Sequence, residues 1–152
     1  MKKKVHSIAS MLATMTIATF FLSTIFVELF GTHEAVAYVK NLIVIPGLFI
    51  LVPAIAAAGG SGQALSKSRQ GKLVDAKKKR MPFIAANGLL ILIPCAIVLD
   101  GWASEGKFDE MFYLVQSIEL LAGATNLTLM SLNIRDGLKL NGKLRTSNAR
   151  VS

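Results

Sequence analysis

Apolar residues in this chain gather into four long runs, and short stretches between the runs carry most of the charge. The runs cover residues 7–30, 39–59, 81–102 and 111–133. Each reaches the roughly 20 residues that an α-helix needs to cross the apolar core of a bilayer. A soluble bundle would keep a charged face on every helix, which this pattern lacks. We therefore predict an all-α fold, an integral membrane four-helix bundle that forms a single domain over residues 1–152.

The basic residues alternate between the two ends of these runs. Lys and Arg gather at the N-terminus, in a predicted basic loop at 61–80 and in a predicted tail at 134–152, whereas the other two connections are mainly acidic. Four spans place the three basic segments on one side, and the positive-inside rule makes that side cytoplasmic. We predict a multi-pass protein of the bacterial inner membrane with both termini in the cytoplasm.

The N-terminus has a competing interpretation as a secretory signal, because "MKKK" and an apolar run precede the small residues "AVA" at 35–37. Cleavage at Ala37 would leave three spans and place the new N-terminus outside. The apolar run is about 20 residues long, whereas such signals have about 7–15 apolar residues. Glu28 and His33 also separate the run from the cleavage motif. We favour a first helix that is retained.

The fourth run carries a polar stripe within its apolar sequence. At 100° per residue, its polar and small residues fall within an arc of roughly 100°; they are Gln116, Glu119, Gly123, Asn126 and Asn133. Polar groups in a span usually face the interior of the bundle or a cavity. Glu119 is predicted to lie at the depth of Ser23, and Asn126 at the depth of Asn87.

This stripe indicates a candidate ligand or proton site made of Glu119, Gln116, Asn126, Asn87 and Ser23. The sequence places no Lys or Arg at the depth of Glu119. We therefore expect a neutral Glu119 that bonds Ser23 or the carbonyl of Leu42, which Pro46 frees from its helix. We favour a purely structural role, in which Glu119 links two helices, over a proton-accepting role, because one acid makes a poor proton relay.

Small residues recur every four positions on the second run, at Ala54, Ala58 and Gly62. Such a pattern lets a second helix approach closely. We predict that this face packs against another helix, either within the chain or in a partner.

Composition supports a membrane protein and argues against several other classes. Hydrophobic residues make up 53% of the chain, and the net charge is +8. The basic cluster Lys77, Lys78, Lys79 and Arg80 has no interleaved aromatic residue, so we expect contact with lipid headgroups and no binding of nucleic acid.

Candidate chemistry is sparse. The chain has one cysteine, and its two histidines, His6 and His33, are predicted at opposite ends of the first helix. Haem bound for electron transfer would require facing histidines within the spans, so it is the least favoured alternative. We find no nucleophile–base set or phosphate-binding loop, and we expect no enzyme activity, no metal and no cofactor.

Four segments resemble those of small four-span inner-membrane proteins of bacteria: "ELFG" at 28–31, "KKKRMPFIAANG" at 77–88, "VQSIELLAGATNLTL" at 115–129 and "LNIRDGL" at 132–138. The resemblance implies a membrane location but no activity. The leading hypothesis is an accessory or assembly protein that acts through helix contacts with a second copy or a membrane-protein partner. The alternative is a small proton-coupled carrier that uses Glu119.

Overall fold

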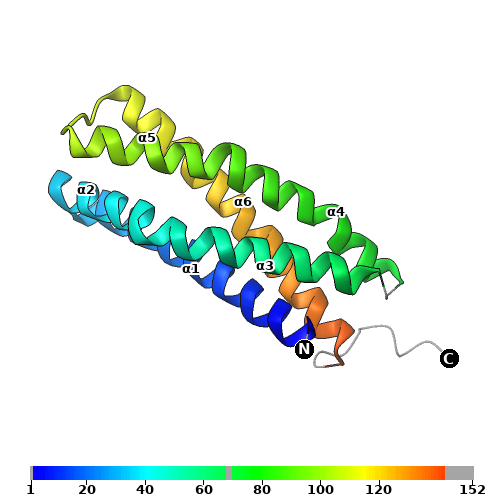
Figure 1. Cartoon of the computed structure of the whole chain (residues 1–152). Coiled ribbons are helices and arrows are strands. Elements are labelled where there is room, and N and C mark those ends of the chain that lie inside the picture. Colours follow the sequence, from blue (N-terminus) through cyan, green and yellow to red (C-terminus); the bar gives the residue numbers. More distant parts are fainter. Residues whose placement is uncertain (1, 68–69, 143–152) are drawn as a thin grey trace.

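The computed structural model describes residues 2–67 and 70–142, and these residues form helices joined by short connections (Figure 1). The all-α prediction is confirmed over this part of the chain. The helical segments are α1 (Lys2–Phe30), α2 (His33–Leu42), a π-helical turn η1 (Ile43–Leu48), α3 (Phe49–Ser66), α4 (Lys72–Asn87), a second π-helical turn η2 (Gly88–Leu92), α5 (Ile93–Ser104) and α6 (Glu110–Leu140).

These segments make four long rods, because α2, η1 and α3 run on as one irregular helix and α4, η2 and α5 as another (Figure 1). Three of the rods are long and apolar enough to cross a membrane: Lys3–Phe30, His33–Ser66 and Lys72–Ser104. The fourth rod, α6, has 31 residues, but its polar stripe makes it less apolar. Large apolar side chains such as Leu22, Phe49 and Leu90 cover the outside of the rods.

Local sequence explains where the rods begin and where they bend. The hydroxyl of Thr32 accepts a hydrogen bond from the Ala35 N–H, and the carboxylate of Asp109 accepts one from the Phe112 N–H. Both are standard N-cap contacts that satisfy amides at a helix start. The π-helical turn η1 contains Pro46, which lacks an N–H and cannot continue a regular α-helix.

The helices extend beyond the predicted spans. The basic loop predicted at 61–80 is largely helical, since α3 ends at Ser66 and α4 begins at Lys72. Likewise α6 continues to Leu140 into the predicted tail. Residues 68–69 of that loop and 143–152 of that tail lie outside the described residues. The polar ends can remain helical because helix formation depends on the backbone, whereas span prediction measures only the apolar part.

The rods pack as two pairs. α1 packs along most of α3, α6 packs against α4 and α5, and contacts between α1 and α6 and between α2 and α5 join the pairs. One buried apolar cluster lies in the middle of the bundle, on the side of the start of α1, with Ala13, Ile17, Leu51, Ala54, Ile84 and Met130. A second cluster fills the opposite end, with Val36, Leu99, Ala103 and Phe112.

The small-residue face of α3 packs closely against other helices, as predicted. Ala54 is 5% exposed, and the carbonyl oxygen of Ala58 lies 3.0 Å from Nδ1 of His6 on α1. A methyl group added to Gly62 would overlap the side chain of Met81 and crowd His6. This face therefore packs against other helices of the same chain, mainly against α1.

We expect Ala54→Leu to lower the free energy of unfolding by about 1–3 kcal/mol, because three extra carbons must fit a filled contact. Ala57→Leu, on the exposed side of the same helix, is the matched control and should leave stability unchanged. Thermal unfolding in detergent measures both. Equal melting temperatures for Ala54→Leu and the parent would show that this contact is loose.

Candidate functional site

A buried ion pair lies between the two apolar clusters. Nζ of Lys40 on α2 is 2.5 Å from Oε2 of Glu119 on α6. The Lys40 side chain is 0% exposed and that of Glu119 12%. Removing one partner of a buried ion pair leaves the other charge uncompensated at a cost of about 3–5 kcal/mol, so each group depends on the other for its stability.

Two further polar side chains extend this centre. Nε2 of Gln116 donates a hydrogen bond to Oε2 of Glu119 at 3.1 Å, and Gln116 itself is 3% exposed. Glu28 on α1 lies close enough to interact electrostatically with both Lys40 and Glu119. Oε1 of Gln116 and Oε1 of Glu28 are buried without a hydrogen-bond partner. The centre therefore holds one lysine, two carboxyl groups and two unused acceptor oxygens.

This arrangement corrects the expected environment of Glu119. A basic residue does lie at its depth, and its partner is Lys40 and not Ser23 or the Leu42 carbonyl. Ser23 donates instead to the carbonyls of Thr19 and Phe20 on its own helix. Hydroxyl groups in helices often form such local bonds, which leave none for a neighbouring helix.

Lys40 was not predicted to lie inside the bundle, because the second span was predicted to start at residue 39, which put Lys40 at its outer edge, beside the preceding connection. The structure starts that helix at His33, which places Lys40 two turns inside it. Thr32 followed by His33 and Glu34 is a signal for a helix start, since Thr is a favoured N-cap and an acid suits the first turn. That signal could have located Lys40 within the span.

A pair of asparagines forms a second polar level, as the depth estimate predicted. Nδ2 of Asn87 on α4 donates to Oδ1 of Asn126 at 2.9 Å and to the carbonyl of Ala122 at 2.8 Å. Asn126 is 0% exposed, and its Nδ2 lies 3.4 Å from the carbonyl of Ile84. These bonds tie α4 to α6, and they lie apart from the Lys40–Glu119 pair along α6.

A third polar level joins the same two helices near the termini. NH1 of Arg80 lies 2.7 Å from Oδ2 of Asp136, which is 1% exposed. Burial alone would raise the pKa of Asp136, but the hydrogen bond and charge of Arg80, with the charge of Arg135, hold it below its ordinary value. Of the four basic residues predicted to meet lipid headgroups, Arg80 is therefore engaged within the chain.

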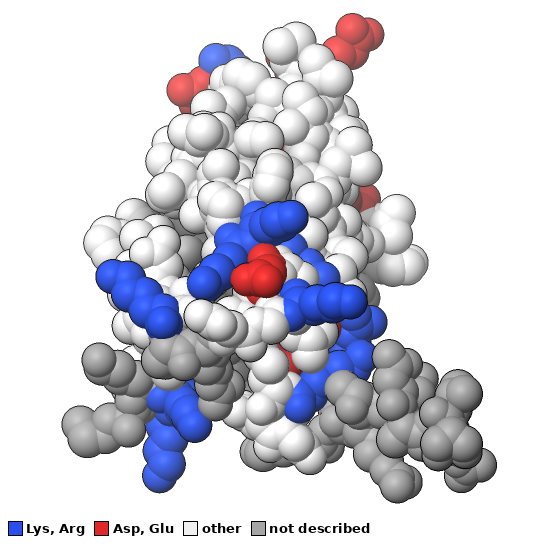
Figure 2. Space-filling model, turned by 90° about the vertical axis from the view of Figure 1, so that its right-hand side faces the viewer, with Lys and Arg blue, Asp and Glu red and all other residues white. Residues whose placement is uncertain are grey.

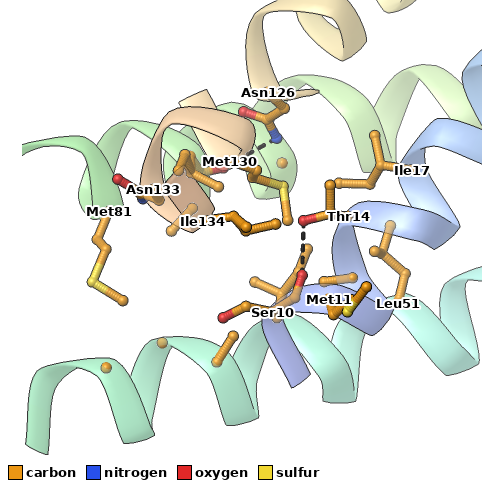
Figure 3. A pocket seen from close by; sticks show the side chains of 18 of the residues that line it. Ser10, Met11, Thr14, Ile17, Leu51, Met81, Asn126, Met130, Asn133 and Ile134 are labelled. Carbon is orange, nitrogen blue, oxygen red and sulfur yellow. Dashed lines mark hydrogen bonds between the residues drawn. The ribbon is translucent and has the colours of Figure 1, made fainter. Parts of the chain in front are cut away.

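A cavity of about 630 Å³ runs through the bundle beside these levels. Its wall includes Lys3, His6, Lys77 and Lys78 near the termini, and Glu119 towards the opposite end. Between them the wall is mainly apolar: Figure 3 shows Ile17 and Leu51 facing it together with Met130 and Ile134 from α6. The volume falls within the roughly 300–1,000 Å³ typical of small-molecule sites.

The two histidines, His6 and His33, pack against other parts of the protein. His6 lies against α3, while the ring of His33 stacks on Phe108 with 4.1 Å between ring centroids. His6 lies near the start of α1, whereas His33 is the first residue of α2, beyond the other end of α1. Within the described ranges, no group of three or more His, Cys, Asp or Glu side chains is placed to hold a metal ion.

Comparisons with protein-family models, curated proteins and solved structures find no match for this chain. Function must therefore be argued from the geometry of the ion pair and the cavity.

We expect Lys40→Met to lower the free energy of unfolding by about 3 kcal/mol, because it leaves the Glu119 carboxylate buried without its cation. The double variant Lys40→Met/Glu119→Leu removes both charges and should recover most of that loss. Unfolding in a detergent titration measures both variants. A double variant as unstable as Lys40→Met would mean that the two side chains do not compensate each other.

Proposed function

We propose that this chain is a four-span protein of the bacterial inner membrane with both termini in the cytoplasm. Three apolar rods and the apolar outer surface support insertion. Figure 2 looks at the end of the molecule where α1 begins and α6 ends, and Lys and Arg side chains gather there. The positive-inside rule assigns that end to the cytoplasm. The polar side chains of α6 have partners inside the bundle, which supports α6 as the fourth span.

Within this membrane protein, the cavity binds a ligand and Glu119 acts as the group that responds to it or to a proton. The supporting observation is that Glu119 belongs both to the cavity wall and to the ion pair with Lys40. A ligand or proton that reaches Glu119 through the cavity competes directly with Lys40. This is the chemistry of a small proton-coupled carrier.

The neighbouring oxygens offer Lys40 an alternative partner when Glu119 is occupied. Oε1 of Glu28 and Oε1 of Gln116 lack partners, and Glu28 interacts electrostatically with Lys40. Movement of the ammonium group from Glu119 towards Glu28 would keep the lysine neutralised and would alter the contact between α2 and α6. Proton binding at Glu119 is thereby linked to helix packing.

Assembly through helix contacts, the leading hypothesis from the sequence, has less support. Its main signal was the small-residue face of α3, and that face is used against α1. We assign the apolar surface that remains to contact with lipid.

Trp102, the single tryptophan, packs against the apolar cluster next to the ion pair and can report on this link. In lipid nanodiscs, we expect the fluorescence of Trp102 to change with pH. This pH-dependent change should be absent in Glu119→Gln, because the amide cannot bind or release a proton. Glu105→Gln, which alters an exposed acid in the loop nearest Trp102, is the control and should retain it.

If Glu119→Gln folded normally and showed the same pH response as the parent, Glu119 would not be the responsive group. The ion pair would then have a structural role alone.

A further inference from the structure

The cavity is electrostatically asymmetric along its length. Lys3, Lys77 and Lys78 line its cytoplasmic end from two different rods. Among the residues that the structure describes, Glu119 is the one acidic side chain in the wall, and its charge is compensated by Lys40 towards the opposite end. A ligand with an anionic group would therefore be held at the cytoplasmic end, with its apolar part directed into the bundle.

The cavity also reaches the apolar outer surface of the bundle. Val52 on α3 and Leu89 on η2 both line the cavity, yet they are 42% and 59% exposed. α3 packs along α1 but has few contacts with α4. The side of the cavity between α3 and η2 is therefore open towards the region that lipid would occupy, and a molecule dissolved in the bilayer can enter there.

We propose that the cavity binds one acyl chain of an anionic phospholipid from the cytoplasmic leaflet, with the headgroup at Lys3, Lys77 and Lys78. The proposal rests on the proposed function in treating the cavity as a ligand site, and it does not depend on proton binding at Glu119. Basic pockets between helices on the cytoplasmic side suit anionic headgroups. The apolar wall around Ile17 and Met130 suits the chain.

The three consecutive lysines in the first half of α4 distinguish a lipid bound in the cavity from general attraction of anionic lipid to a basic surface. Lys77 and Lys78 line the cavity, whereas Lys79 lies beside a different, shallow pocket with Arg80 and Phe83. Lys78 and Lys79 are both exposed, adjacent and equal in charge. Attraction of the leaflet to the whole basic surface would treat them alike, whereas a lipid held in the cavity would depend on Lys78.

Native mass spectrometry of the purified protein can count the lipid that remains bound when phosphatidylglycerol or phosphatidylcholine with identical chains is added. We expect one phosphatidylglycerol to be retained in preference to phosphatidylcholine. Lys78→Gln should weaken its binding about fivefold, the effect of about 1 kcal/mol for one basic residue at an anionic surface. Lys79→Gln should leave binding unchanged.

A second pair of variants tests the position of the acyl chain of the lipid. Gly59 and Gly60 both have open space where a side chain would start, but only Gly59 lies in the cavity wall. Gly59→Leu should therefore place its side chain in the space proposed for the acyl chain and weaken retention of the lipid, whereas Gly60→Leu should not. Both replace a helical glycine by a better helix former, so neither should impair folding.

Equal loss in Lys78→Gln and Lys79→Gln would overturn the proposed headgroup site. If Gly59→Leu retained as much lipid as the parent protein, the acyl chain would lie outside the cavity and the proposal would be overturned. Neither outcome bears on the pH response of Glu119, so failure here is distinguishable from failure of the proton-coupled function.

Discussion

The polar side chains of α6 must find partners within the bundle, and the packing of the other helices follows from that requirement. In the membrane-spanning arrangement that we propose, water cannot satisfy the polar groups of α6, and an unpaired charge in the bilayer core costs about 3 kcal/mol or more. α6 meets the requirement at two levels within its predicted span and makes a third polar contact beyond the end of that span. Glu119 pairs with Lys40, Asn126 with Asn87, and Asp136 with Arg80. Each partner comes from another rod.

These contacts fix the rotation of α6 and leave the cavity beside it. Two of the three levels bind α6 to α4, and the third binds it to α2. The α1–α3 pair is held separately by its small-residue face. None of these contacts joins α3 to η2, so space remains between the two pairs of rods. The polar requirement thus accounts both for a buried ionisable centre and for a route to it.

The sequence predicted the parts of this structure that follow from periodicity. The polar arc on the fourth run identified Gln116, Glu119 and Asn126 as inward-facing, and the depth estimate paired Asn126 with Asn87. The four-residue spacing of Ala54, Ala58 and Gly62 identified the face that packs. In each case the spacing of residues along one helix was enough to predict which of them share a face, because the geometry of an α-helix is known.

What the sequence missed depends on contacts between helices or on where a helix begins. Lys40 was placed at the outer edge of the second span, because hydropathy marks the apolar part of a helix and not its capped start at Thr32. Ser23 was expected to cross to α6, but a hydroxyl in a helix has an equally good acceptor one turn back. Arg80 was assigned to lipid because its partner, Asp136, lies 56 positions away.

The most direct test is whether α6 crosses the membrane, since its polar stripe makes it the least apolar of the four rods. Reporter domains can be placed in the connection before α6, at residues 105–109, and after the last described residue of its C-terminal turn, Gly142. We predict that the first reporter is active outside the cytoplasmic membrane and the second inside the cytoplasm. Activity of both reporters on the same side would contradict a membrane-spanning α6. It would also contradict the claim that the polar contacts of α6 satisfy groups buried in a bilayer.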